Sequence, residues 1–211
     1  MSMALVKDLR EKTGAGLLDC QKALGEAEGD VEKALRVLRE KGLAKAAKKG
    51  TRVAADGAVT AYIHPGGKVG VLLEVNCETD FVARTDEFQA LLRDLAMQVA
   101  AASPRFVRRE DVPEGELEAE RAIYRAQAEQ SGKPAQVIER IIAGQVDRFY
   151  KDVCLLEQAF IKQSDRSVND VVQEAVARLG ENITVRRFAR FQLGESMEPK
   201  KESPAGGPPG S

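Results

Sequence analysis

The residue types that most often carry out covalent chemistry are scarce in this 211-residue chain. His64 is its one histidine, and its three cysteines, Cys20, Cys77 and Cys154, lie far apart and form no Cys-x-x-Cys pair. That pattern fits neither a disulfide framework nor a zinc site. Each cysteine falls on an apolar stripe or beside leucines, as buried structural thiols do. We therefore expect reduced thiols, no catalytic residue, no metal site and no cofactor.

Phosphate-binding and nucleophile motifs are also missing. Gly66-Gly67-Lys68 comes nearest to a phosphate-binding loop, but it lacks both the earlier glycine and the hydroxyl residue that should follow the lysine. No dinucleotide fingerprint and no serine nucleophile elbow occur. We therefore expect a protein that is not an enzyme and acts by binding other proteins.

The charge balance narrows the classes of partner. The 32 basic and 33 acidic residues leave a net charge of -1, whereas a dedicated nucleic-acid binder is usually strongly basic. The basic cluster within residues 45–52 holds no aromatic side chain to stack on bases, and we interpret it as a solvated helical linker. Charges interrupt the first apolar stretch, and no apolar run approaches the roughly 20 residues of a membrane helix. We expect a cytoplasmic protein with no direct nucleic-acid partner and no membrane partner.

Thr79, Asp80, Phe81 and Val82 form the segment most in need of a functional explanation. They place an aromatic ring and a carboxylate side by side where a predicted strand gives way to a helix. Such a corner can present Phe81 as a projecting anchor, with Asp80 as an acceptor or a helix cap. Phe81 also shares a rough stripe with Phe88 and Leu92, and the pattern alone favours a core residue.

Three short helices are predicted before this segment. Helical spacing puts Cys20, Ala23, Leu24 and Ala27 on one face of the second helix. Asp30 is a suitable N-cap for the third helix, and Gly42 a suitable C-terminal end. None of these helices can bury its apolar face alone, so we expect them to pack together.

The remainder predicts a mixed architecture of the α+β class. Alternating residues predict an antiparallel hairpin of strands at 59–63 and 69–77, and the last strand at 183–193. Helical patterns begin near Asp86, which with Gln89 suggests a capping box, and near Ser167. Helices at 116–130 and from Pro134 onward are joined by a short polar connection, which predicts a helical hairpin over residues 116–152. We expect the polar tail, residues 196–211, to be disordered.

Four motifs in this order resemble the elongation factor Ts family. They are the run EVNCETDFVAR at residues 74–84, the runs LREKTGAG and LLDC at 9–20, GENI followed by VRRF at 180–188, and SGKP at 131–134. Together they span the chain from Leu5 to about Glu195. The resemblance implies a protein that binds elongation factor Tu and promotes the release of GDP, and with it the loss of Mg²⁺, from that GTPase.

The resemblance also implies which residues touch the partner. The segment matching Thr79, Asp80, Phe81 and Val82 is associated with dislodging the magnesium ion, and the aromatic matching Phe81 wedges between helices of the GTPase. Further positions that match partner-binding residues lie in the N-terminal unit and in the strand hairpin: Arg10, Leu17, Leu18 and His64. From the helical pattern, Leu17 fits the core stripe, whereas Leu18 falls off it.

The implied organisation has three parts. Residues 1–52 match a ubiquitin-associated-like three-helix domain with its linker, residues 53–195 match an exchange-factor core, and residues 196–211 are the tail. The core is single, whereas longer members of the family contain a duplicated core. A short form can recover the missing surface by forming a homodimer. The alternative function is a protein-binding adaptor that uses the N-terminal three-helix unit alone.

Overall fold

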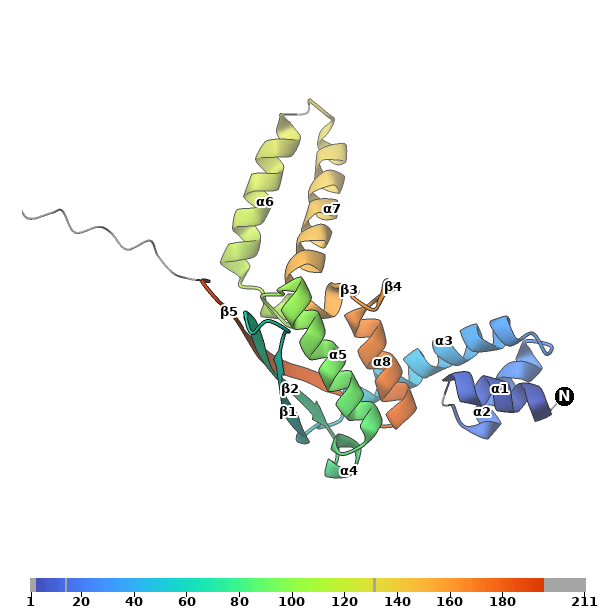
Figure 1. Ribbon diagram of the computed structural model, residues 1–211. Helices are drawn as coiled ribbons and strands as arrows, with labels where there is room; N and C mark the ends of the chain where they lie inside the picture. The colour runs from blue at the N-terminus through green and yellow to red at the C-terminus, as the bar shows by residue number, and fades with distance from the viewer. Residues whose placement is uncertain (1–2, 14, 131, 196–211) are drawn as a thin grey trace, which may run out of the picture.

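The computed structural model describes residues 3–13, 15–130 and 132–195, apart from the side chains of residues 43–48. The predicted tail at 196–211 lies outside this description, as do Gly14 and Ser131, which we expected in connections. The fold is α+β, as predicted: three N-terminal helices precede a small antiparallel sheet packed with helices (Figure 1).

The N-terminal unit consists of α1 (Met3–Thr13), α2 (Leu17–Glu26) and α3 (Val31–Lys49). Its small core includes the predicted face of α2, and Asp30 caps α3 as expected, because its carboxylate accepts a hydrogen bond from the Lys33 backbone N–H at 3.0 Å. The expectation that this helix ends at Gly42 was wrong. Gly42 lies where α3 crosses the helix α8 (Val168–Leu179), and a Cβ added there would approach the Ala177 Cβ at 3.3 Å. The glycine therefore permits close packing of two helices and does not end one.

A three-stranded antiparallel sheet forms the centre of the molecule, in the order β1-β2-β5. Its strands are β1 (Asp56–Ile63), β2 (Val69–Cys77) and β5 (Thr184–Gln192). The predicted alternation in β2 is confirmed, because Val71, Leu73, Val75 and Cys77 are all buried. Arg187 faces Glu74 across the strands, and its Nε donates to that carboxylate at 2.6 Å.

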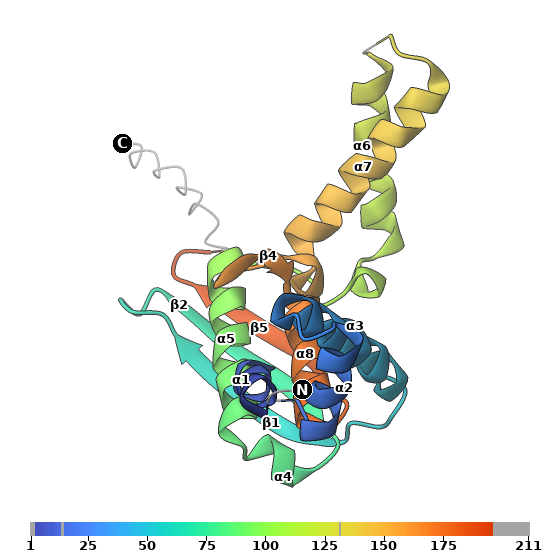
Figure 2. The same cartoon turned by 90° about the vertical axis from the view of Figure 1, so that its right-hand side faces the viewer.

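The helices α5 (Asp86–Ala102) and α8 cover one face of this sheet, and the main core lies between them and the strands (Figure 2). A capping box of Asp86 and Gln89 was expected at the start of α5 and is wrong. The N-cap is Thr85, whose hydroxyl accepts from the Phe88 N–H at 3.2 Å, while the Gln89 amide donates to the Ala83 carbonyl. Ser167 caps α8 as predicted.

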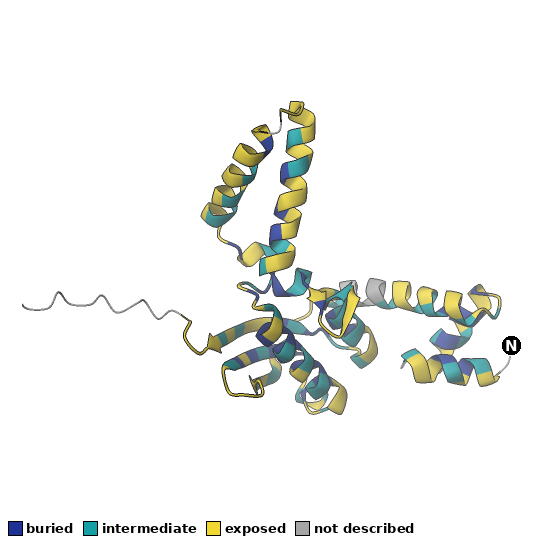
Figure 3. Ribbon diagram, turned by 45° about the horizontal axis from the view of Figure 1, so that its top comes forward, coloured by how far each residue is buried: buried dark blue, intermediate teal, exposed yellow. Residues whose placement is uncertain are grey.

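The predicted helical hairpin is confirmed. It consists of α6 (Glu114–Glu129) and α7 (Ala135–Val153), which pack side by side and project away from the sheet (Figure 1). Their buried residues face each other, and their outer faces are exposed (Figure 3).

A second sheet of two short strands was not predicted. It pairs β3 (Ala159–Phe160) with β4 (Gln163–Ser167) beside the base of the hairpin. The short helical turns η1 (Arg109–Asp111) and η2 (Leu155–Glu157) flank that base. The sequence of β4 is polar and does not alternate, so it carries no strand signal.

Candidate partner-binding site

The segment 79–82 forms an exposed corner directly after β2. Thr79 is the N-cap of the four-residue helix α4 (Asp80–Ala83), and its hydroxyl accepts from the Val82 backbone N–H at 3.4 Å. Ala83 is buried in the main core and Val82 is half-buried against it. These two residues attach the corner to the core, so that α4 has a fixed inner side.

Phe81 occupies the outer side of α4. Its side chain is 81% exposed, so the core residue that the pattern alone favoured is contradicted. Phe88, the next residue of that supposed stripe, is fully buried. The geometry of the corner instead fits the alternative interpretation, in which the ring projects as an anchor.

Asp80 lies beside Phe81 and is half-buried. One carboxylate oxygen lies 2.7 Å from an Arg84 guanidinium nitrogen, in a pair open to solvent. The cap of the following turn is Thr79, not Asp80, because Thr79 holds the position before the first helical residue. The Asp80 side chain can therefore interact with a partner without uncapping the helix.

A residue that sequence analysis did not single out completes this corner. The carboxylate of Glu181 accepts hydrogen bonds from the backbone N–H and from the hydroxyl of Thr79, at 3.0 Å and 2.7 Å. Glu181 belongs to the GENI run at 180–183, but nothing in one sequence indicates that it contacts a residue 102 positions earlier. The contact depends on β5 and β2 being neighbours in the sheet.

The other predicted contact residues lie elsewhere. Arg10, Leu17 and Leu18 are exposed on α1 and α2 of the N-terminal unit. Leu18 is 69% exposed, as its position off the buried face predicts. The placement of Leu17 in the core stripe was wrong, because it is 42% exposed. Leu17 is the first residue of α2, so no earlier turn of that helix covers it.

His64 is exposed at the far end of the strand hairpin, where its Nδ1 lies 3.0 Å from the Tyr62 hydroxyl. Gly70 pairs with Ile63 at that end, and Cys77 pairs with Asp56 at the end nearer α4. Seven residue steps along β2 at about 3.3 Å each separate the two ends by roughly 23 Å. The predicted residues thus occupy three separate places, and a partner that touched all of them would need an extended surface.

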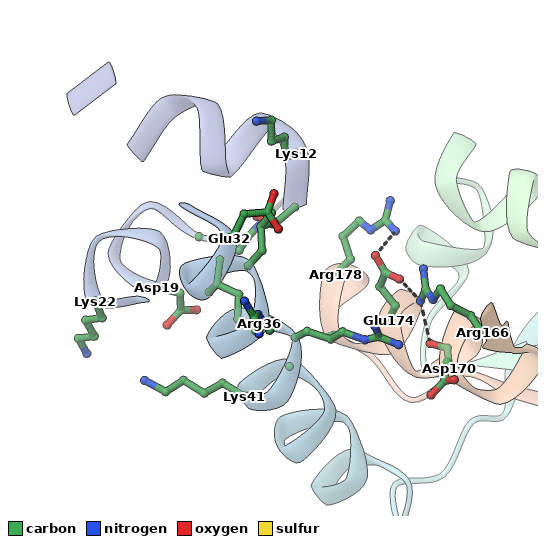
Figure 4. A pocket seen from close by; sticks show the side chains of 18 residues that line it. Lys12, Asp19, Lys22, Glu32, Arg36, Lys41, Arg166, Asp170, Glu174 and Arg178 are labelled. Atoms are coloured by element: carbon green, nitrogen blue, oxygen red, sulfur yellow. Dashed lines mark hydrogen bonds and ion pairs between the residues drawn. The ribbon is translucent and has the colours of Figure 1, made fainter. Parts of the chain in front are cut away.

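A cleft of about 400 Å³ lies between the N-terminal helices and α8 (Figure 4). Its lining carries both charges, and on the α8 side Glu174 pairs with Arg166 and with Arg178. No residue of the predicted contact set lies in this lining. The cleft therefore marks where the N-terminal unit meets the core.

The thiols are poorly suited to nucleophilic chemistry. All three cysteines are buried and free, as predicted. Burial raises the pKa of Cys77, and the negative charge of Glu181 adds to this. Burial together with the charge of Glu157 raises the pKa of Cys154 to about 11. Both thiols stay protonated near neutral pH, whereas a nucleophile needs the thiolate.

The described part of the chain contains neither a metal-binding cluster nor a membrane-spanning helix. Among the described residues, no group of three or more His, Cys, Asp or Glu side chains is arranged to hold a metal ion. Over the same part of the chain, no helix is long and apolar enough to cross a membrane.

Comparison with known proteins gives a consistent result. Residues 25–195 match the family model described as Elongation factor TS. The chain is 59% identical over 198 residues to elongation factor Ts of Carboxydothermus hydrogenoformans, covering 94% of this chain and 91% of the relative. It is 58% identical to that of Geobacter sulfurreducens, covering 96% and 94%. It is 57% identical to that of Thermoanaerobacter pseudethanolicus, covering 94% and 97%.

Proposed function

This chain belongs to the elongation factor Ts family and is a translation elongation factor, and we propose that it binds elongation factor Tu and promotes the release of GDP from it. Release of GDP and of the accompanying Mg²⁺ lets GTP bind in its place. The protein makes and breaks no covalent bond in this role. Its place of action is the cytoplasm, where translation elongation takes place.

The exposed Phe81 ring is the observation that carries this proposal. A large apolar side chain that is 81% exposed gains free energy when a partner buries it. Its helix is capped at Thr79 and attached to the core through Ala83, so little ordering is needed on binding. A projecting aromatic on a fixed support suits insertion between elements of a partner.

Differential binding is enough to explain exchange. An exchange protein that prefers the GTPase conformation with distorted phosphate and Mg²⁺ sites lowers the affinity of the GTPase for GDP. By linkage, GDP lowers the affinity of the GTPase for the exchange protein to the same extent. Each tenfold loss of GDP affinity requires about 1.4 kcal/mol of differential binding. One buried aromatic anchor contributes roughly 2–4 kcal/mol at a protein interface, which corresponds to one to three such steps.

The separate exposed residues fit an extended contact. We propose that Thr79, Asp80, Phe81 and Val82 act at the nucleotide site, while Arg10, Leu17 and Leu18 hold the GTPase through the N-terminal unit. His64, at the other end of the sheet, contacts a different part of elongation factor Tu. The adaptor alternative uses the three-helix unit alone, whereas the family match extends through residue 195.

The test is a nucleotide-release assay. Elongation factor Tu loaded with fluorescent GDP is mixed with this protein and excess unlabelled nucleotide, and the loss of signal is followed. We expect release to accelerate with the concentration of the protein until it saturates. Release at the spontaneous rate at every concentration would contradict the proposal.

The outer face of the sheet supports the proposed homodimer. It exposes Val59 and Ile63 on β1, Leu72 on β2 and Phe191 on β5. Leu72 lies between Ala61 and Ala189 in the pairing register, so the apolar surface is continuous across the strands. A continuous exposed apolar surface typically marks an interaction site, and we propose that a second copy of the chain covers it.

The proposed dimer is tested by light scattering during gel filtration. We expect the mass of a dimer for the protein and the mass of a monomer for Phe191→Asp. Val53→Asp is the matched control, because Val53 is also exposed but lies outside the sheet. A monomeric mass for the unmodified protein, or an unchanged dimer for Phe191→Asp, would exclude this face as the interface.

A further inference from the structure

Glu181 joins the end of α8 to the start of α4. It follows Gly180, the left-handed C-cap of α8, and its carboxylate reaches across to the chain leaving β2. Oε2 accepts from the backbone N–H groups of Glu78 and Thr79, at 3.1 Å and 3.0 Å. Oε1 accepts from the Thr79 hydroxyl at 2.7 Å. One carboxylate thus receives three hydrogen bonds from two consecutive residues.

Glu78 makes the reciprocal contact. Its Oε1 accepts from the Asn182 backbone N–H at 2.7 Å, and it lies 3.6 Å from an Arg52 guanidinium nitrogen. The Asn182 side-chain amide donates to the Arg52 carbonyl at 2.7 Å. Three segments distant in sequence, at residues 52, 78–79 and 181–182, are therefore held together. We call this set the carboxylate clamp.

Thr79 connects the clamp to Phe81. Its hydroxyl donates to Glu181 and accepts from the Val82 N–H at 3.4 Å. The same oxygen atom therefore belongs to the carboxylate clamp and caps α4. The Cys77 thiol donates to the Thr79 carbonyl at 3.1 Å. A helix of four residues cannot maintain itself, because helix formation becomes favourable only over many more residues. Packing of Val82 and Ala83 on the core holds the end of α4, and the contacts of Thr79 hold its start.

Water could satisfy most of the polar groups that the clamp joins. Thr79 is exposed, and Glu78 and Glu181 are only half-buried. Asn182 is the buried polar member of the clamp, at 5% exposed, and losing its hydrogen bonds would be costly. The part of the clamp that joins Glu181 to Thr79 is not required to satisfy buried polar groups. What it adds is a fixed position for the residue that starts α4.

We propose that Glu181 is a positioning residue for nucleotide exchange, which holds Thr79 so that α4 presents Phe81 in a single orientation before the partner arrives. The advantage is that the free protein has already ordered the segment that binding requires to be ordered. This inference rests on the proposed exchange function. Its first test does not need the partner.

The first test places a reporter at the corner. The chain has no tryptophan, so Phe81→Trp introduces a single fluorophore, and its time-resolved anisotropy reports nanosecond motion of α4. We expect Glu181→Ala in this background to increase the amplitude of that motion. Glu116→Ala is the matched control, because its carboxylate also receives two hydrogen bonds, from Arg105 at the base of the helical hairpin. Equal motion with and without Glu181 would overturn the proposal.

The second test separates positioning from surface contact in the release assay. We expect Glu181→Ala, with Phe81 intact, to lower the maximal rate of GDP release at least tenfold. The concentration for half-maximal effect should change little, since the N-terminal unit still makes its contacts. A higher half-maximal concentration with an unchanged maximal rate would overturn the proposal, because it would mean only a lost contact.

Glu181→Gln keeps both tests decisive if the alanine variant does not fold. The carboxamide oxygen can still accept from the backbone N–H groups, but its NH₂ group can only donate to the Thr79 hydroxyl, so the charge-assisted hydrogen bond from that hydroxyl is replaced by a weaker one. We expect intermediate motion and an intermediate maximal rate, and values equal to the unmodified protein would overturn the proposal. If the unmodified protein fails to accelerate GDP release, the proposed exchange function is wrong. The anisotropy measurement still decides whether Glu181 positions α4.

Discussion

Phe81 and Phe88 lie seven residues apart but in opposite environments. Phe88 is fully buried between α5 and the sheet, whereas Phe81 is 81% exposed on α4. The same residue type therefore stabilises the fold at one position and remains available to a partner at the other. The difference lies in the local backbone, because a spacing of seven would place both rings on one face of a continuous helix.

The helix is not continuous between them. α4 ends at Ala83, and Thr85 begins α5 as its N-cap. This break resets the helical phase, so the stripe that holds Phe88 does not extend back to Phe81. The N-caps Thr79 and Thr85 begin two separate helices, and in this arrangement Phe88 is buried in the core and Phe81 is exposed.

The largest effect expected from this comparison is on stability at Phe88. Phe88→Ala removes a fully buried ring from the main core and should lower the free energy of unfolding by about 3–5 kcal/mol. That loss is a large part of the roughly 5–15 kcal/mol by which domains are stable. Denaturant unfolding measures it. A loss below about 1 kcal/mol, as for an average surface change, would mean that the two rings do not differ as described.

A second exposed side chain tests whether exposure alone marks a binding residue. Leu18→Asp on α2 should weaken association with elongation factor Tu about tenfold or more, the size of effect expected when an apolar interface residue is lost. Its melting temperature should stay nearly unchanged, because Leu18 is 69% exposed. Leu24→Asp is the contrasting control, since Leu24 is buried in the same helix and its change should unfold the N-terminal unit. A stable Leu18→Asp protein with unchanged affinity would remove Leu18 from the interface.

The smallest change in stability is expected at Asp80. Its pair with Arg84 is open to solvent, and such pairs contribute about 0–1 kcal/mol. Asp80→Ala should therefore fold normally but release GDP more slowly, if the carboxylate acts on the partner. Arg84→Ala separates the two roles, because it removes the ion pair and keeps the carboxylate. Equal loss of activity in both variants would indicate that only the ion pair matters.

Sequence patterns predicted the parts of the fold that local chemistry determines. Alternation located β2, and Ser167 with Gly180 located both ends of α8, because caps act over one turn. Patterns failed where contacts between distant segments decide. Gly42 resembles a helix end, but its role is to let α3 approach Ala177.

In the candidate site, too, local sequence identified some residues, whereas others are defined only by contacts between distant segments. Residues 79–82 could be named from their motif and from their place after a strand, and Leu18 from its position off the buried face. The exposure of Phe81 was not predicted, because the pattern treated Phe81 as part of the stripe of Phe88 although a new helix was expected to begin near Asp86. The contacts of Glu181 follow only from the neighbouring strands β2 and β5.

Phe81→Ala tests the central claim most directly, when stopped-flow release of labelled GDP is measured beside thermal unfolding. An exposed anchor adds little to the stability of the free protein, and its loss appears in the partner complex. We expect a variant that unfolds at the temperature of the unmodified protein and has lost most of its acceleration of GDP release. A variant that is stable and fully active would contradict the account, since Phe81 would then be exposed without being used.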